Sequence, residues 1–110
     1  MPSTTINRGN VASTTVISLV LTPSLLTTGT VAEQTFSVPG LQTTDQISGV
    51  SLVSGAWTNL TTIAAFRVSA ANTLGITFAN STAGSLTPPS GTYLIEVNRP
   101  EAQTLPANLA

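Results

Sequence analysis

The chain has 110 residues, the length of one domain, and such a chain buries roughly 65% of the surface that it exposes when unfolded. It contains no cysteine, histidine or lysine, only three arginines and four acidic residues, and its net charge is −1 at pH 7. This composition excludes disulfides, thiol and histidine catalysis, Schiff-base chemistry and zinc sites, and it provides no basic footprint for nucleic acid.

Hydroxyl groups supply most of the polarity. The chain has 20 threonines and 12 serines, whereas charged residues make up only 6%, against roughly 25% in ordinary soluble domains. Threonine favours strands because its branched side chain packs well on a pleated surface. Subunits with so little charge can pack closely without repelling one another, which favours a component of an assembly over a freely diffusing protein.

The first 12 residues are predicted to form an extended arm, with Ile6 and Arg8 as its apolar and charged groups. The alternative is an untethered, frayed terminus. No apolar run approaches the roughly 20 residues of a membrane-spanning helix, since the longest, Val16–Leu21, stops before a proline. A secretory signal with Val16–Leu26 as its apolar core is disfavoured, because hydroxyl residues dilute it and Thr27–Gly29 is a poor cleavage site.

The first predicted strand is Thr14–Leu21, and both of its faces are partly apolar. Ile17, Leu19 and Leu21 share one face, while Val16 and Val20 lie on the other. This pattern predicts a central strand or a strand that meets a partner.

The second and third strands are predicted at Thr30–Val38 and Gln46–Val53. In the second, Ala32, Phe36 and Val38 face inward, and Pro39-Gly40 indicates the turn that follows. In the third, Val50 and Leu52 share one face and Ile47 lies on the other, while Gly49 indicates a bulge or a close approach. Trp57 is interpreted as a cap on the end of the core, in preference to a platform that stacks on a ligand.

A hairpin is predicted next, with strands Ile63–Val68 and Thr73–Ala79 around the turn Ser69–Asn72, because asparagine tolerates the left-handed backbone that such a turn needs. After the proline-containing loop Asn80–Gly91 comes a last strand, Thr92–Val97. The predicted core joins four of these side chains: Phe66, Phe78, Tyr93 and Ile95.

Six or seven short strands at about 8–12-residue spacing, with no helical periodicity, predict an all-β fold. We expect a small antiparallel β-sandwich or a jelly-roll-like barrel over residues 13–98. The N-terminal arm (residues 1–12) and a C-terminal tail (residues 99–110) would extend from it.

The residues predict no enzyme, no cofactor and no small-molecule substrate. Glu33 and Glu96 could form a carboxylate pair like that of a glycosidase, but two exposed strand residues are the favoured interpretation. The acidic residues are too scattered for a calcium site. The sequons at Asn59 and Asn80 are interpreted as chance matches in a chain rich in threonine and serine.

The segments Val68–Leu74, Thr77–Gly84 and Pro88–Tyr93 read VSAANTL, TFANSTAG and PPSGTY. Together they resemble a pattern seen in small β-rich virion proteins of tailed bacteriophages, and the resemblance covers about a third of the chain. It implies a protein on the exterior of the virion, either a capsid decoration (cement) protein or part of a fibre. Because this family is not defined by a catalytic motif, the resemblance assigns no functional residue in this chain.

The leading hypothesis is therefore a capsid decoration protein that bridges subunits of the major capsid protein by non-covalent contacts, as a homotrimer. It would bind neither nucleic acid nor a membrane. The alternatives are a phage fibre, tail or receptor-binding module, and a secreted carbohydrate-binding or adhesion domain. The residues expected to contact a partner chain lie in and beside the two terminal segments: Ile6, Arg8, Arg99, Leu105 and Leu109.

Overall fold

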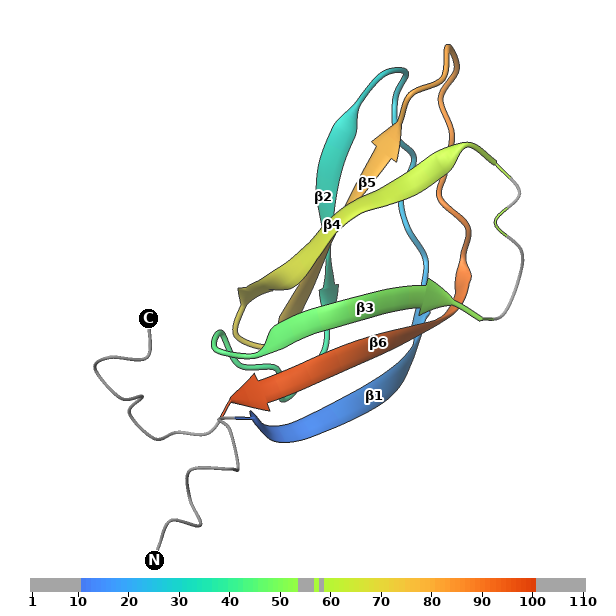
Figure 1. Ribbon diagram of the computed structural model, residues 1–110. Helices are drawn as coiled ribbons and strands as arrows, with labels where there is room; N and C mark the ends of the chain where they lie inside the picture. Colours follow the sequence, from blue (N-terminus) through green and yellow to red (C-terminus); the bar gives the residue numbers. More distant parts are fainter. Residues whose placement is uncertain (1–10, 54–56, 58, 101–110) are drawn as a thin grey trace, which may run out of the picture.

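The computed structural model of the chain describes residues 11–53, 57 and 59–100 (Figure 1). It confirms the all-β prediction. Each predicted strand is found, with small changes at the ends, and the six strands are β1 (Val11–Leu21), β2 (Val31–Ser37), β3 (Gln46–Leu52), β4 (Thr61–Ala70), β5 (Thr73–Asn80) and β6 (Gly91–Pro100).

The strands form two antiparallel three-stranded sheets with the orders β1-β6-β3 and β2-β5-β4. In Figure 1 the sheet β1-β6-β3 lies below the sheet β2-β5-β4, and the strands of the two sheets cross at a steep angle. The arrangement is a small β-sandwich in which β5 and β6 are the central strands.

The core lies between the two central strands because both have a regular inward-facing alternation. Leu74, Ile76 and Phe78 of β5 are fully buried, and so are Tyr93 and Ile95 of β6. Leu21, Leu26, Val38, Leu41 and Val97 complete the set of buried hydrophobic residues.

Phe66 is the exception among the predicted core residues. It is half-buried and lies outside the cluster that contains Phe78, Tyr93 and Ile95. Phe66 lies opposite Ile76 and shares the inward face with Val68, as predicted, but it lies at the seam between the sheets, where it lines a groove beside β3. The prediction that Phe66 belongs to the core was therefore wrong.

A register shift in β3 places Ile47 on the other face of the sheet from the one predicted. The shift lies between Ile47 and Gly49, where one extra residue is inserted opposite β6, as the glycine had indicated. Because of this bulge, Ile47 packs on the core together with Val50 and Leu52, whereas strict alternation had placed Ile47 on the opposite face.

The hairpin between β4 and β5 turns over two residues, Ala71 and Asn72, instead of the four predicted. Asn72 has the expected left-handed backbone, with a φ of 62°. Its Oδ1 accepts a hydrogen bond from the amide of Gly40, and its carbonyl accepts one from the amide of Val38. The turn is thus fastened to the loop that follows β2.

The two sequons have a structural role. In each, the asparagine Oδ1 accepts hydrogen bonds from the amide and the hydroxyl of the threonine two residues later, Thr61 or Thr82. Asn80 is 1% exposed, and its Nδ2 donates to the carbonyls of three residues, Leu26, Thr27 and Gly84. An amide nitrogen held in this way is not available for glycosylation.

Trp57 caps one end of the core, as expected. Its ring packs edge-on against Tyr93 with a centroid separation of 6.5 Å. Its indole N–H donates to the carbonyl of Thr61, and the Tyr93 hydroxyl donates to the carbonyl of Pro89. These bonds join the start of β4 and the loop before β6 to the core.

Candidate interaction surface

The charged residues that the structure describes do not form a reactive cluster. Glu33 lies on the outer face of β2-β5-β4 and Glu96 on the outer face of β1-β6-β3, so the two carboxylates are on different sheets and cannot form a glycosidase pair. Within residues 11–53, 57 and 59–100, no group of three metal-ligating side chains is found. The acidic groups are instead engaged in pairwise contacts.

Arg99 is the predicted partner-contact residue that the structure describes. Its Nε and Nη2 donate to the two oxygens of Asp45 at 2.9 and 2.8 Å, and its Nη2 also donates to the carbonyl of Gly40 at 2.9 Å. The expected carboxylate thus comes from within the chain and joins the end of β6 to the loop before β3. The contact of Arg99 with a partner chain stays a prediction, as do those of Ile6, Arg8, Leu105 and Leu109, which lie outside the described residues.

The Asp45 carboxylate is fully buried, and it also accepts a hydrogen bond from the amide of Gln42 at 2.9 Å. The hydrogen bonds from Arg99 are the main reason why the pKa of Asp45 lies below its ordinary value, and the backbone bond acts in the same direction. The Asp45 carboxylate therefore has a structural role, and both of its oxygens already accept hydrogen bonds from within the chain.

A second ion pair lies on the outer face of β2-β5-β4. Arg67 Nε and Nη2 donate to Glu33 Oε2 and Oε1 at 2.8 and 2.9 Å, and these bonds lower the pKa of Glu33. The Glu33 side chain lies over Gly75, where a Cβ atom would meet its carboxylate at 2.3 Å. The glycine leaves the space in which the pair forms across the central strand.

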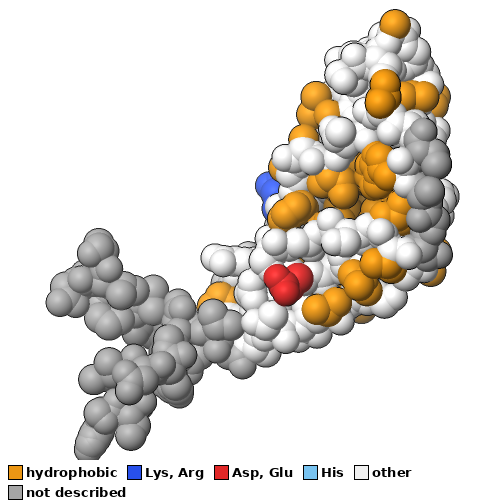
Figure 2. Space-filling model, turned by 45° about the vertical axis from the view of Figure 1, so that its right-hand side comes forward, with side chains coloured by type: hydrophobic (Ala, Val, Ile, Leu, Met, Phe, Trp, Pro, Cys, Tyr) orange, Lys and Arg blue, Asp and Glu red, His pale blue; other side chains and the backbone are white. Residues whose placement is uncertain are grey.

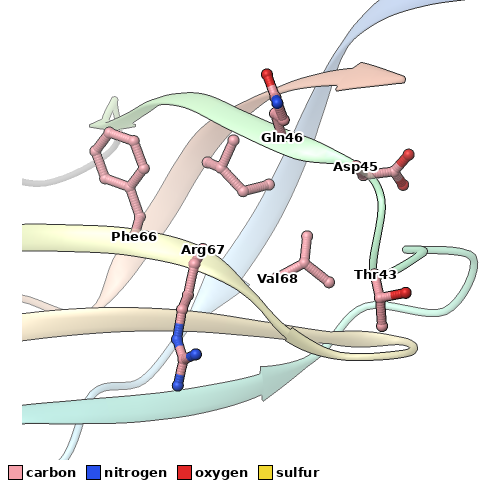
Figure 3. A pocket seen from close by; sticks show the side chains of 7 residues that line it. Thr43, Asp45, Gln46, Phe66, Arg67 and Val68 are labelled. Atoms are coloured by element: carbon pink, nitrogen blue, oxygen red, sulfur yellow. The ribbon is translucent and has the colours of Figure 1, made fainter. Parts of the chain in front are cut away.

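A groove of about 410 Å³ lies between β3 and β4, where the two sheets meet. Figure 3 shows Phe66 and Val68 directed toward β3, whereas Arg67 and Asp45 point away from the groove. Both charged residues are occupied by the ion pairs described above. The groove is therefore a seam between the sheets with a mixed polar and apolar lining, and its two charged residues already pair with other side chains of the chain.

The outer face of β1-β6-β3 carries apolar side chains that the fold does not use. Val16 and Val20 on β1 are 57% and 79% exposed, and Val53 directly after β3 is 52% exposed. Leu94 of β6, half-buried, lies opposite Ser18 of β1 and Ser51 of β3. We call this set, Val16, Val20, Val53 and Leu94, the valine face.

The surroundings of the valine face are nearly neutral. Its neighbours on the same outer face are hydroxyl residues, together with Glu96, whose carboxylate accepts a hydrogen bond from Ser48. Figure 2 shows a row of hydrophobic side chains across the lower sheet beside one acidic side chain, and a second gathering of them in the hollow between the sheets. The valine face is the candidate functional surface, because a partner could cover it at little desolvation cost.

The sequence predicted only part of this surface. The apolar residues on both faces of the first strand predicted either a central strand or a strand that meets a partner. Among the described strands β1 lies at the edge of its sheet, with β6 as its neighbour, so the structure does not place it centrally. The predicted contact residues were placed in and beside the terminal segments, and the contribution of Val53 and Leu94 was missed because they come from other strands.

Comparisons of the chain with protein-family models, with curated proteins and with solved structures find no match. Among the described residues, there is no helix with the length and hydropathy needed to cross a membrane.

Proposed function

We propose that this chain is a structural virion protein that decorates the exterior of a tailed-phage head and stabilises the shell by contacts with the major capsid protein. The resemblance of the segments in its C-terminal half to small phage virion proteins suggests this class. The observation that carries the proposal is the valine face, an outer sheet surface with exposed apolar side chains among hydroxyl residues and one acidic residue, Glu96. A surface of this kind fits permanent docking on another protein.

The mechanism is non-covalent bridging. Val16 and Val20 keep more than half of their surface exposed, so covering each of them would contribute about 1 kcal/mol per copy. Contributions of this size are weak for one subunit, but they add up over the many copies on a shell. A near-neutral protein can also occupy neighbouring positions without mutual repulsion, since the chain has a net charge of only −1.

Binding of the purified full chain to phage heads that lack it tests the proposal. Two substitutions, Val53→Lys and Leu94→Lys, place a charge on the valine face, and the matched control Thr35→Lys places the same charge on an exposed position of the other sheet. We expect the wild-type chain and the control to co-sediment with heads, and the two valine-face variants to remain in the supernatant. Failure of the wild-type chain to bind, or equal binding by all four, would contradict the proposal.

The position of the protein on the particle separates this proposal from the fibre or tail alternative. A decoration protein is distributed over the whole shell, whereas a fibre, tail or receptor-binding module is confined to the tail or to one vertex. Gold-labelled antibody against the chain, viewed by electron microscopy, would distinguish the two distributions. Label at the tail alone would replace the decoration proposal with that alternative.

A further inference from the structure

The outer edge of β1 is the least protected sheet edge that the structure describes. From Ser13 to Leu21 the strand has no charged residue, no proline and no register shift. By contrast, β2 carries Glu33, while β3 and β4 contain bulges. Charges, prolines and bulges are the usual means by which proteins prevent edge-to-edge pairing, so an edge without them is suited to pairing.

The backbone groups that this edge presents follow from the pairing of β6. The amide of Val53 donates to the carbonyl of Thr92, so Thr92 directs its backbone polar groups toward β3. Because successive residues of a strand alternate in direction, Tyr93 and Ile95 direct theirs toward β1. Their partners Leu19 and Ile17 therefore bond to β6.

The intervening residues of β1 direct their N–H and C=O groups away from β6, toward the open edge. No described strand pairs with this edge. These outward-directed residues are also those whose side chains lie on the outer face of the sheet: Thr14, Val16, Ser18 and Val20.

We propose that two copies of this chain pair through the β1 edges, antiparallel and about a two-fold axis, and so join their β1-β6-β3 sheets into one six-stranded sheet. The two-fold axis would pass beside Ser18. In this register Val16 of one copy lies opposite Val20 of the other, and Ile17 lies opposite Leu19. Apolar residues then meet apolar residues on both faces of the new sheet.

A second copy is the occupant that the residues favour. The edge is uncharged throughout, so two identical strands meet without placing like charges opposite each other. The nearest charge on the same face, Glu96, lies one strand further from the axis and accepts a hydrogen bond from Ser48 of its own chain. The register also covers the two valines with the largest exposure on this strand.

The proposal predicts a dimer in solution, whereas the leading hypothesis from the sequence is a homotrimer. A contact made mainly by one strand edge is smaller than the roughly 1,200 Å² of a standard interface, so we expect a dissociation constant in the micromolar range or weaker. Sedimentation equilibrium of the full chain should therefore show a monomer that becomes a dimer as its concentration rises. A monomer at all concentrations up to about 1 mM, or a trimer, would overturn the proposal.

Charge substitutions test the register. The double variant Val16→Lys with Val20→Lys places lysines opposite each other at two points, so we expect the dissociation constant to rise about tenfold. Val16→Lys with Val20→Glu places opposite charges at the same two points and should restore the dimer. Val53→Lys, on the far side of the same sheet, is the control that should leave it unchanged. A dimer insensitive to the first variant would refute pairing at this edge.

Amide hydrogen exchange gives a readout that does not depend on substitutions. The amides of Val16, Ser18 and Val20 should become protected as the concentration rises, while those of Ile17 and Leu19 should be protected at every concentration by their bonds to β6. Association without this alternating pattern would show that the copies meet at another surface and would overturn the proposal.

Discussion

Replacement of Asn80 by alanine removes five side-chain hydrogen bonds at once. Three are donated by Nδ2 to the carbonyls of Leu26, Thr27 and Gly84, and two are accepted by Oδ1 from Thr82. Each of the three carbonyls also accepts another hydrogen bond, so none of them is left unpaired. The amide of Thr82 loses its acceptor. At a net 0.5–1 kcal/mol for each bond, we expect a loss of about 3 kcal/mol in the free energy of unfolding.

Asn59→Ala is the matched control, because Asn59 makes the same contacts with the threonine two residues later but, among the described residues, donates to one carbonyl, that of Thr87. Asn59 is half-buried, so water can form part of the hydrogen bonds that the alanine variant loses. We expect a loss of about 1 kcal/mol. Urea unfolding, followed by the fluorescence of Trp57, measures the free energy of unfolding of both variants. We expect the slope of this free energy against urea concentration to be the same as in the wild type. A loss below about 1 kcal/mol for Asn80→Ala, or equal losses for the two, would refute the reasoning.

Three further predictions concern the core and the ion pairs. Phe78→Ala should lower the free energy of unfolding by about 3–5 kcal/mol, because Phe78 is fully buried between the sheets; a loss below about 1 kcal/mol in urea unfolding would contradict this. Since the pKa of Asp45 is lower in the folded protein, its contribution is present above its ordinary pKa of 3.8 and is lost as the pH falls through the folded value. Unfolding of Asp45→Asn should therefore depend less on pH in this acidic range than unfolding of the wild type, and an identical pH profile would exclude this role. Gly75→Ala should displace the Glu33 carboxylate and break its ion pair without unfolding the protein, because only the flexible end of Glu33 must move; the pKa of Glu33, measured by NMR titration, should rise toward its ordinary value, and an unchanged pKa would show that the pair survives.

The sequence predicted the strands well because their alternation is local. The inward faces of β5 and β6 have no bulge, so Phe78, Tyr93 and Ile95 could be placed in the core from periodicity alone. Ile47 was placed incorrectly because it precedes a bulge, and an inserted residue reverses the facing of the strand beyond it. Phe66 has the predicted facing, opposite Ile76, but it lies at the seam between the sheets, and that position depends on how the sheets pack. Gly49 indicated the bulge of β3, whereas no residue indicated the two register shifts of β4.

The candidate surface was harder to predict because it is assembled from three strands. The apolar outer face of β1 is visible in the sequence as Val16 and Val20. Its edge position depends on the order of the strands, which places β6 between β1 and β3. The pairing of Arg99 with Asp45 joins residues 54 positions apart, and a pair of this kind does not follow from either local pattern.

A map of the source particle by electron cryomicroscopy tests the central claim most directly, because it shows both where the protein lies and which surface it uses. The account predicts density for the chain over the entire exterior of the head, with the sheet β1-β6-β3 toward the capsid and the Glu33–Arg67 pair toward solvent. Density confined to the tail, or a head contact made by the sheet β2-β5-β4, would contradict it.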